Sequence, residues 1–171
     1  MRPAARLHAA GFSLLELMVV VVILSILAVV GYSTYVRQVV KSNRAEARIA
    51  LLAEAARQER YRSEHLSYAS DLITLRGLPD SARGRPLLTE RGHYVLSMRV
   101  TPDGCDGTAA NPCDGFEVIA TAAPGDIQQR DEACYALRIN QAGQQDAIRK
   151  GQSFDSLTPD QRLDAMHRCW G

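Results

Sequence analysis

The chain has 171 residues, with 20 lysines and arginines against 19 aspartates and glutamates. This length allows one globular domain beside a membrane segment. The near-zero net charge excludes an overall basic field that would attract nucleic acid or anionic lipid.

The chain opens with a short basic leader and a long apolar segment. Arg2 and Arg6 precede Gly11-Phe12-Ser13-Leu14-Leu15-Glu16-Leu17-Met18, and the residues that follow are apolar almost without exception to Val30. As a helix, residues 12–30 span about 29 Å, the thickness of a bilayer core. The two arginines predict a cytoplasmic N-terminus. Glu16 is a carboxylate at membrane depth, where charges are costly and usually functional.

A secretory signal peptide or a plain signal anchor is the alternative for this segment. The apolar run is longer than a normal signal-peptide core, and no small-residue cleavage site follows it cleanly. Glu16 would also be out of place in such a core. These features favour a retained membrane helix.

The residues that follow predict that this helix continues. Residues 36–62 contain neither proline nor glycine and are rich in helix formers. One modestly apolar stripe repeats at spacings of three and four residues, comprising Ala47, Leu51, Ala55, Gln58 and Tyr61. We predict one helix over residues 12–64, with a solvated, ion-paired face that includes Arg44, Arg48, Glu54, Arg57 and Glu59.

Alternating apolar residues predict a small antiparallel sheet after the helix. The strands are expected at 93–101, 116–122 and 133–140, with a short fourth strand near 146–149. The segment Thr158-Pro159-Asp160-Gln161 combines a hydroxyl N-cap, proline at N1 and glutamine at N3. It predicts a short terminal helix that ends at about His167.

Four cysteines follow the apolar segment: Cys105, Cys113, Cys134 and Cys169. Their even number predicts two disulfides in an oxidising compartment, and three pairings are open. Without a Cys-x-x-Cys pair, a zinc ribbon is disfavoured. Asp103, Asp106 and Asp114 lie around the first cysteine pair; solvated loop acids are favoured over a calcium site, which stays open.

The start of the chain resembles the class III leader of type IV pilins and pseudopilins. The resemblance rests on the glycine, phenylalanine, hydroxyl residue, two aliphatic residues and glutamate at 11–16, before an aliphatic helix. It implies a prepilin peptidase that cuts between Gly11 and Phe12 and N-methylates Phe12. It also implies that Glu16 pairs with the Phe12 amine of a neighbouring subunit. Alternatively, Glu16 is only a peptidase recognition element or snorkels to the interface.

Later segments are similar to minor pilins of the PilE-like group. They are Ser42–Ala47, Gln58–Tyr61, His65–Tyr68 and the closing Cys169-Trp170. The implied fold is α+β: a long N-terminal transmembrane and spine helix packed on an antiparallel sheet of about four strands. Ser25 and Ser33 stand where the family often has glycine and proline, so we expect no local melting of the helix there.

The resemblance divides the chain into a removed leader (1–11), a transmembrane and assembly half of the helix (12–31), a helical spine (32–64) and an αβ-loop, sheet and D-region (65–171). It implies that Cys134 and Cys169 bracket the D-region. We predict the pairs Cys105–Cys113, whose intervening turn formers let the loop close, and Cys134–Cys169, which matches the family's tail.

The implied function is that of a minor structural subunit of a type IV pilus, which is processed and then primes or decorates the fibre in adhesion, twitching motility or DNA uptake. Partners would be major and minor pilins, the prepilin peptidase and an inner-membrane assembly platform. The chain would be a single-pass inner-membrane protein with a periplasmic C-terminal domain, and later part of an extracellular pilus.

Three alternatives remain. One is a type II secretion pseudopilin. Another is a DNA-binding tip pilin for competence, but Arg83, Arg85 and Arg91 form the only local basic cluster, so we expect no nucleic-acid partner. The third is a membrane-anchored enzyme. We find no catalytic constellation, and we expect no enzyme activity, metal or cofactor.

Overall fold

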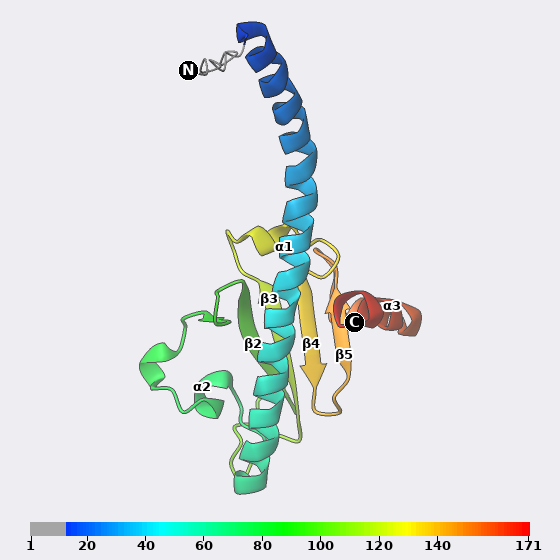
Figure 1. Ribbon diagram of the computed structural model, residues 1–171. Helices are drawn as coiled ribbons and strands as arrows, with labels where there is room; N and C mark the ends of the chain where they lie inside the picture. The colour runs from blue at the N-terminus through cyan, green and yellow to red at the C-terminus, as the bar shows by residue number, and fades with distance from the viewer. Residues whose placement is uncertain (1–12) are drawn as a thin grey trace, which may run out of the picture. The chain divides into compact units, whose positions relative to one another are not determined.

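A computed structural model of the chain describes residues 13–171 (Figure 1). The chain forms two compact units, one that ends at Gln38 and one that spans Val39–Gly171.

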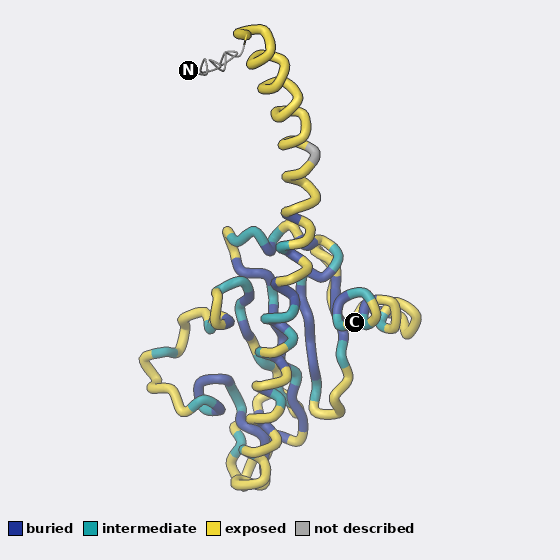
Figure 2. The backbone as a smooth tube through the Cα atoms, viewed as in Figure 1, coloured by how far each residue is buried: buried dark blue, intermediate teal, exposed yellow. Residues whose placement is uncertain are grey.

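Helix α1 (Leu14–His65) supplies all but the first of the described residues of the first unit and continues into the second. Its described side chains from Leu14 to Tyr35 are exposed, as Figure 2 shows in yellow. This stretch is long and apolar enough to cross a membrane. The helix is continuous at Ser25 and Ser33 in the single chain, and the Ser25 hydroxyl donates to the Val21 carbonyl oxygen at 2.7 Å.

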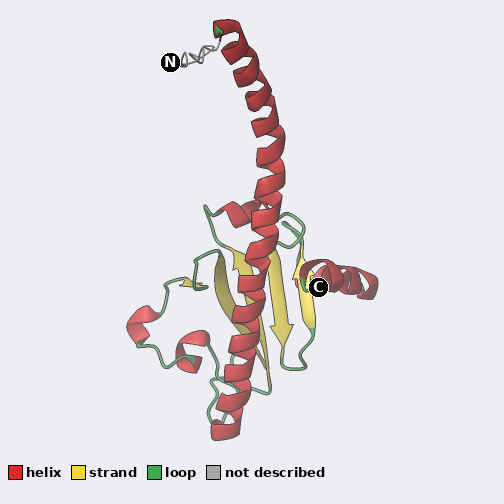
Figure 3. Ribbon diagram, viewed as in Figure 1, coloured by secondary structure: helices red, strands yellow, loops and turns green. Residues whose placement is uncertain are grey.

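The second unit is an antiparallel sheet against which the second half of α1 packs (Figure 3). Its strand order is the sequence order, and the strands are β1 (Leu87–Leu88), β2 (Tyr94–Thr101), β3 (Gly115–Ala122), β4 (Ala136–Asn140) and β5 (Gln145–Ile148). The four longer strands agree with the prediction from alternating residues. Such a meander needs only short connections, and residues 141–144 alone join β4 to β5.

The main core lies between α1 and one face of the sheet. Ala47 and Leu51 of α1 are fully buried and pack in one cluster with Val118 of β3 and Leu137 of β4. These two helix residues belong to the predicted apolar stripe, which is therefore confirmed. The small side chain of Ala47 lets the helix approach the sheet closely.

The prediction that Arg44 and Glu54 face solvent is wrong. Arg44 is buried and makes two hydrogen bonds to the Asp131 carboxylate, at 2.7 and 2.9 Å. Glu54 is 2% exposed, and one of its oxygens accepts hydrogen bonds from Arg57 and Arg76. Buried charges are tolerated when paired, and two of these partners come from distant loops that helix periodicity does not reveal.

Several short elements escaped the sequence analysis. They are β1, helix α2 (Leu72–Leu75) and the 3-10 helices η1 (Asp80–Ala82), η2 (Ile127–Arg130) and η3 (Phe154–Ser156). Each is too short to show a recognisable periodic pattern. Strand β1 pairs with β2 through Leu87 opposite Leu96, which adds a fifth strand to the four predicted.

The second face of the sheet is partly covered from the C-terminal region. Phe154 of η3 and Leu157 pack with Ile119 and Ile148 in a smaller cluster. Helix α3 (Pro159–Cys169) then begins with the predicted capping box, in which Thr158 and Gln161 satisfy each other's backbone N–H groups. The helix ends two residues later than predicted.

Two disulfides are present in the structure. Cys105 bonds to Cys113 across the β2–β3 connection, and Cys134 bonds to Cys169 at the end of α3. Of the three pairings open from the number of cysteines, this is the one that the sequence analysis favoured.

Candidate functional site

The residues predicted to be processed lie at the start of the chain. Gly11 and Phe12 fall outside the described residues, 13–171. Glu16 lies in the first turn of α1 and is exposed. Glu16 therefore lies on the surface of the apolar helix.

Helix α3 is held beside β5 by a network around Asp146. This buried carboxylate accepts hydrogen bonds from Arg138 of β4 at 2.6 Å and from Arg162 of α3 at 2.7 Å. The Asp146 carbonyl oxygen accepts a hydrogen bond from the Trp170 indole at 3.0 Å. The Cys134–Cys169 disulfide ties the other end of the helix to the segment that enters β4. These contacts fix the position of α3 beside β5.

Three cations surround an open depression where β5 ends and α3 passes. We call this set the cationic rim: Arg149, Lys150 and Arg168. The depression has a volume of about 610 Å³, and Glu132 is the only acid among its lining residues. Lys150 lies 5.7 Å from the centre of the Tyr135 ring, within the range of a cation–π contact.

The cations of the rim differ in how far they are neutralised. Arg168 pairs with Asp164 one turn earlier on α3. Within residues 13–171, the Arg149 guanidinium and the Lys150 ammonium have no carboxylate partner. The depression therefore carries positive charge that could bind phosphate or carboxylate groups.

A second hollow of about 610 Å³ lies between α1 and the αβ-loop, and its charges are balanced. Its lining includes three glutamates and three arginines: Glu46, Glu54, Glu90, Arg57, Arg76 and Arg91. Glu54 is paired with two of these arginines. This hollow offers no comparable excess of positive charge.

The arginine cluster noted in the sequence is partly neutralised. Arg83 pairs with Asp71 at 2.6 Å and with Asp80 at 2.9 Å. Burial opposes the ionisation of Asp71, but hydrogen bonds from Arg83 and Thr74 outweigh it and hold the pKa of this carboxyl below its ordinary value of 3.8. Arg83 therefore helps to hold the αβ-loop together.

The acidic loop does not gather its carboxylates. Asp103, Asp106 and Asp114 are all exposed. Hydrogen bonds from Thr108 lower the pKa of Asp106, which acts as a local turn acceptor. Within the part of the chain that the structure describes, no three His, Cys, Asp or Glu side chains are placed to hold a metal ion.

The sequence analysis missed the cationic rim because its members are far apart in the chain. A signal was nevertheless available. Cys134 follows Ala133, and Cys169 follows Arg168. The predicted Cys134–Cys169 bond therefore brings Arg168 beside the segment at 132–133, and the Arg149-Lys150 pair lies at the end of the short strand predicted near 146–149.

Comparison with protein families gives two matches. A model described as type IV minor pilin ComP, DNA uptake sequence receptor, matches residues 33–138, more than half of the chain. A model of the prokaryotic N-terminal methylation motif matches residues 6–32. No curated protein matches the chain. The first match favours a type IV pilin over the secretion pseudopilin that was left open. The chain therefore belongs to the type IV minor pilin family, a structural family, and is a membrane-anchored pilin that works with other pilins and the pilus machinery.

Proposed function

We propose that this minor pilin receives DNA during uptake and that the cationic rim contacts the DNA backbone. The matching family is described as a DNA uptake sequence receptor. The observation that carries the proposal is the convergence of Arg149, Lys150 and Arg168 on one open depression with a single acidic lining residue. Duplex DNA carries one negative charge per about 1.7 Å of its axis, so neighbouring phosphates would reach separate members of the rim.

This proposal departs from the expectation that nucleic acid is not a partner. That expectation rested on the near-neutral composition of the whole chain and on Arg83, Arg85 and Arg91 being the only local basic cluster in the sequence. Within the D-region, however, the charge is local: the rim gathers three cations, while acids such as Glu54 and Asp131 are paired elsewhere with arginines. Phosphate contacts depend on this local field more than on net charge.

Binding of a fluorescent duplex to the full chain in non-ionic detergent micelles tests the proposal. Arg149→Gln, Lys150→Gln and Arg168→Gln should each weaken binding. Each should also lower the slope of log K against log[salt] by about 0.9 for every phosphate that the variant no longer neutralises. Arg85→Gln is the matched control, because Arg85 is an exposed arginine outside the rim.

Equal slopes for the wild type and all three rim variants would refute the rim as the DNA-contacting surface. An equal weakening in Arg85→Gln would show that any exposed arginine serves, which also contradicts the proposal. Thermal unfolding of each variant in the same micelles checks that the fold is retained.

We also infer that the leader is removed between Gly11 and Phe12 and that Phe12 is N-methylated. The match to the methylation motif over residues 6–32 supports this. Intact mass measurement of the membrane-extracted protein should show a chain that begins at methylated Phe12. A mature N-terminus near Gly31 would instead indicate an ordinary signal peptide.

Glu16 is proposed to contact the Phe12 amine of a neighbouring subunit in the fibre. No partner of Glu16 lies among residues 13–171, where its side chain is exposed on an apolar helix. An ion pair in such surroundings fixes register more than it adds stability. Glu16→Ala should therefore leave the protein inserted but sharply reduce its amount in sheared pili. Ser25→Ala, a change on the same apolar stretch, is the control; equal amounts for both variants would refute an assembly contact.

The proposed path is a single pass through the inner membrane, a periplasmic domain, and later a place in an extracellular pilus. The proposed partners are major and minor pilins, the prepilin peptidase and the assembly platform. Two disulfides support an oxidising compartment for the domain. Protease added to spheroplasts should digest residues 39–171 without lysis; protection until lysis would reverse the topology.

A further inference from the structure

A smaller cavity adjoins the cationic rim, between β5, the turn that follows it and α3. Its volume is about 210 Å³. Part of its lining is apolar: Ala133, Ala147, Leu157 and Ala165. Clefts for drug-sized molecules are larger, about 300–1,000 Å³. The cavity is therefore sized for a small group with apolar surface, and it shares Arg149 and Arg168 with the rim.

Two glutamine side chains line this cavity in fixed orientations. The Gln152 amide oxygen accepts a hydrogen bond from the Arg149 backbone N–H at 3.2 Å, and the Gln161 amide oxygen accepts one from the Thr158 N–H at 3.0 Å. An amide whose oxygen is bound to a backbone donor has its NH₂ group left to donate. Neither NH₂ group has an acceptor within residues 13–171, so both are available to an occupant.

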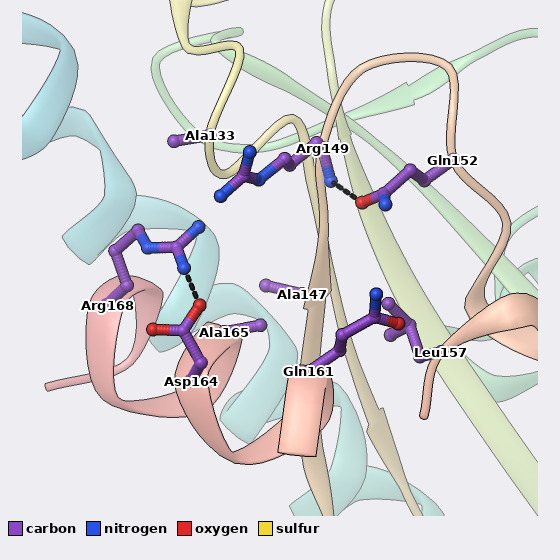
Figure 4. A pocket seen from close by; sticks show the side chains of 9 residues that line it. All are labelled: Ala133, Ala147, Arg149, Gln152, Leu157, Gln161, Asp164, Ala165 and Arg168. Carbon is purple, nitrogen blue, oxygen red and sulfur yellow. Dashed lines mark hydrogen bonds and ion pairs between the residues drawn. The ribbon is translucent and has the colours of Figure 1, made fainter. Parts of the chain in front are cut away.

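The remaining polar lining consists of one free cation and one ion pair. Figure 4 shows Asp164 and Arg168 together on one side of the cavity and the two glutamines on the other, with Arg149 between these groups along the edge. An occupant would therefore meet hydrogen-bond donors on the glutamine side. A carboxylate, already held by Arg168, faces it from the other side.

We propose that this cavity takes one unpaired DNA base, with guanine preferred, while the phosphates beside that base lie on the cationic rim. This inference rests on the proposed DNA-receptor function. Guanine offers two acceptors, O6 and N7, on one edge and the N2 amino donor on another. The O6 and N7 atoms accept hydrogen bonds from the amide and guanidinium donors, and the N2 amino group donates to the Asp164 carboxylate. Adenine would turn its N6 amino group towards these donors.

The apolar lining explains why the base must be unpaired. In a duplex, neighbouring pairs cover the faces of each base, and only its edges are accessible. A base seated on alanine and leucine side chains has to leave the stack, at a cost that is smallest for a single strand or a duplex end. The rim can therefore hold the phosphates of duplex or single-stranded DNA, whereas the cavity takes a base only from a single strand or a frayed duplex end.

The test compares two single strands on the full chain in detergent micelles. One probe is an eight-residue strand of deoxyadenosine, and the other has guanine at one central position. We expect the guanine strand to bind roughly tenfold more tightly, a ratio in the range of a bidentate base contact. Both strands should share the salt slope set by the rim, because their phosphates are identical.

Two isosteric variants probe the donors directly. Gln152→Glu and Gln161→Glu keep the oxygen that accepts the backbone N–H, but replace the amide NH₂ with an acceptor. Each should remove the guanine preference or shift it towards adenine. Gln144→Glu is the matched control, since Gln144 is exposed in the β4–β5 turn at the other end of β5. It adds the same charge and should leave the preference unchanged. Thermal unfolding checks that each variant is folded.

The outcomes separate the two proposals. Equal binding of both strands, with the salt slope intact, overturns the base site and leaves the DNA receptor standing. Disappearance of the preference in Gln144→Glu as well would show that added charge alone is responsible, and this too overturns the base site. If no strand and no duplex binds, the proposed function fails, and this inference fails with it.

Discussion

Gly104 and Gly107 lie three residues apart in the β2–β3 connection, and both have left-handed φ angles, of +79° and +80°. Their surroundings differ. A Cβ atom at Gly107 would lie 3.1 Å from the Tyr68 carbonyl oxygen, whereas one at Gly104 would meet nothing within 4 Å. At Gly107 the disulfide loop passes close to the backbone that follows α1, and glycine is needed there for its size as well as its φ.

This pair gives a prediction at the residue scale. Gly104→Ala should destabilise the domain by about 1 kcal/mol, the penalty for a left-handed alanine. Gly107→Ala should cost about 1 kcal/mol more, because the loop has to move away from Tyr68. Thermal unfolding of the full chain in micelles measures both. Equal costs would show that backbone conformation alone matters at Gly107.

Among the secondary-structure elements, α2 shows how a helix of four residues is held in the αβ-loop. Asp71 caps it by accepting a hydrogen bond from the Thr74 N–H at 2.7 Å, and its other oxygen pairs with Arg83. The same carboxylate thus caps one element and ties down the next loop. Because its pKa is lowered in the folded chain, ionised Asp71 stabilises the fold.

The sign of this effect gives a prediction at the element scale. A carboxyl with a lowered folded pKa contributes its stability above the unfolded value of 3.8, and loses it as pH falls through the folded pKa. Asp71→Asn keeps the capping oxygen but not the charge. Since the ion pair is partly exposed, the variant should be less stable than the wild type by under about 1 kcal/mol at pH 7.

The difference in stability between the wild type and Asp71→Asn should shrink to nothing in acid well below pH 3.8. Asp71→Ala separates the cap from the charge, because it should lose about 1 kcal/mol more than Asp71→Asn at either pH. Denaturant titrations at neutral pH and in acid below the folded pKa would measure these differences. A gap between wild type and Asp71→Asn that persists unchanged in acid would contradict the assignment to the ion pair.

For the chain as a whole, the two disulfides differ in reach. Cys105 and Cys113 are 8 residues apart, whereas Cys134 and Cys169 are 35 apart. The chain-entropy model gives about 2.5 kcal/mol for the short loop and about 4 kcal/mol for the long one. The longer bond also holds α3, which forms a wall of the cationic rim.

Cys134→Ala with Cys169→Ala should therefore destabilise the domain more than Cys105→Ala with Cys113→Ala. It should also release α3 to protease and weaken DNA binding at the rim, while the other double variant leaves both unchanged. Limited proteolysis with mass spectrometry follows the trimming. If both double variants were trimmed alike, the long disulfide would not be what holds α3.

How much of this architecture follows from the sequence depends on the range of the contacts. Local patterns predicted α1, the four longer strands and the capping box of α3, because periodicity and caps act within a few residues. The same patterns put Arg44 and Glu54 in solvent, since only distant loops supply Asp131 and Arg76. The cationic rim was missed for the same reason: Arg149 and Arg168 meet only after α3 folds back on β5.

Some hydrogen bonds of the spine helix α1 are made to residues that are synthesised long after it. Arg44 donates to the Arg168 carbonyl and Arg48 to the Trp170 carbonyl, across 124 and 122 residues of chain. During synthesis, the alanine and leucine stripe of α1 stays uncovered until β3 and β4 have been made. A chain interrupted before β3 should therefore yield a membrane helix with an exposed apolar stripe. Quality-control proteases that recognise exposed apolar residues would remove such a product before it reaches a fibre.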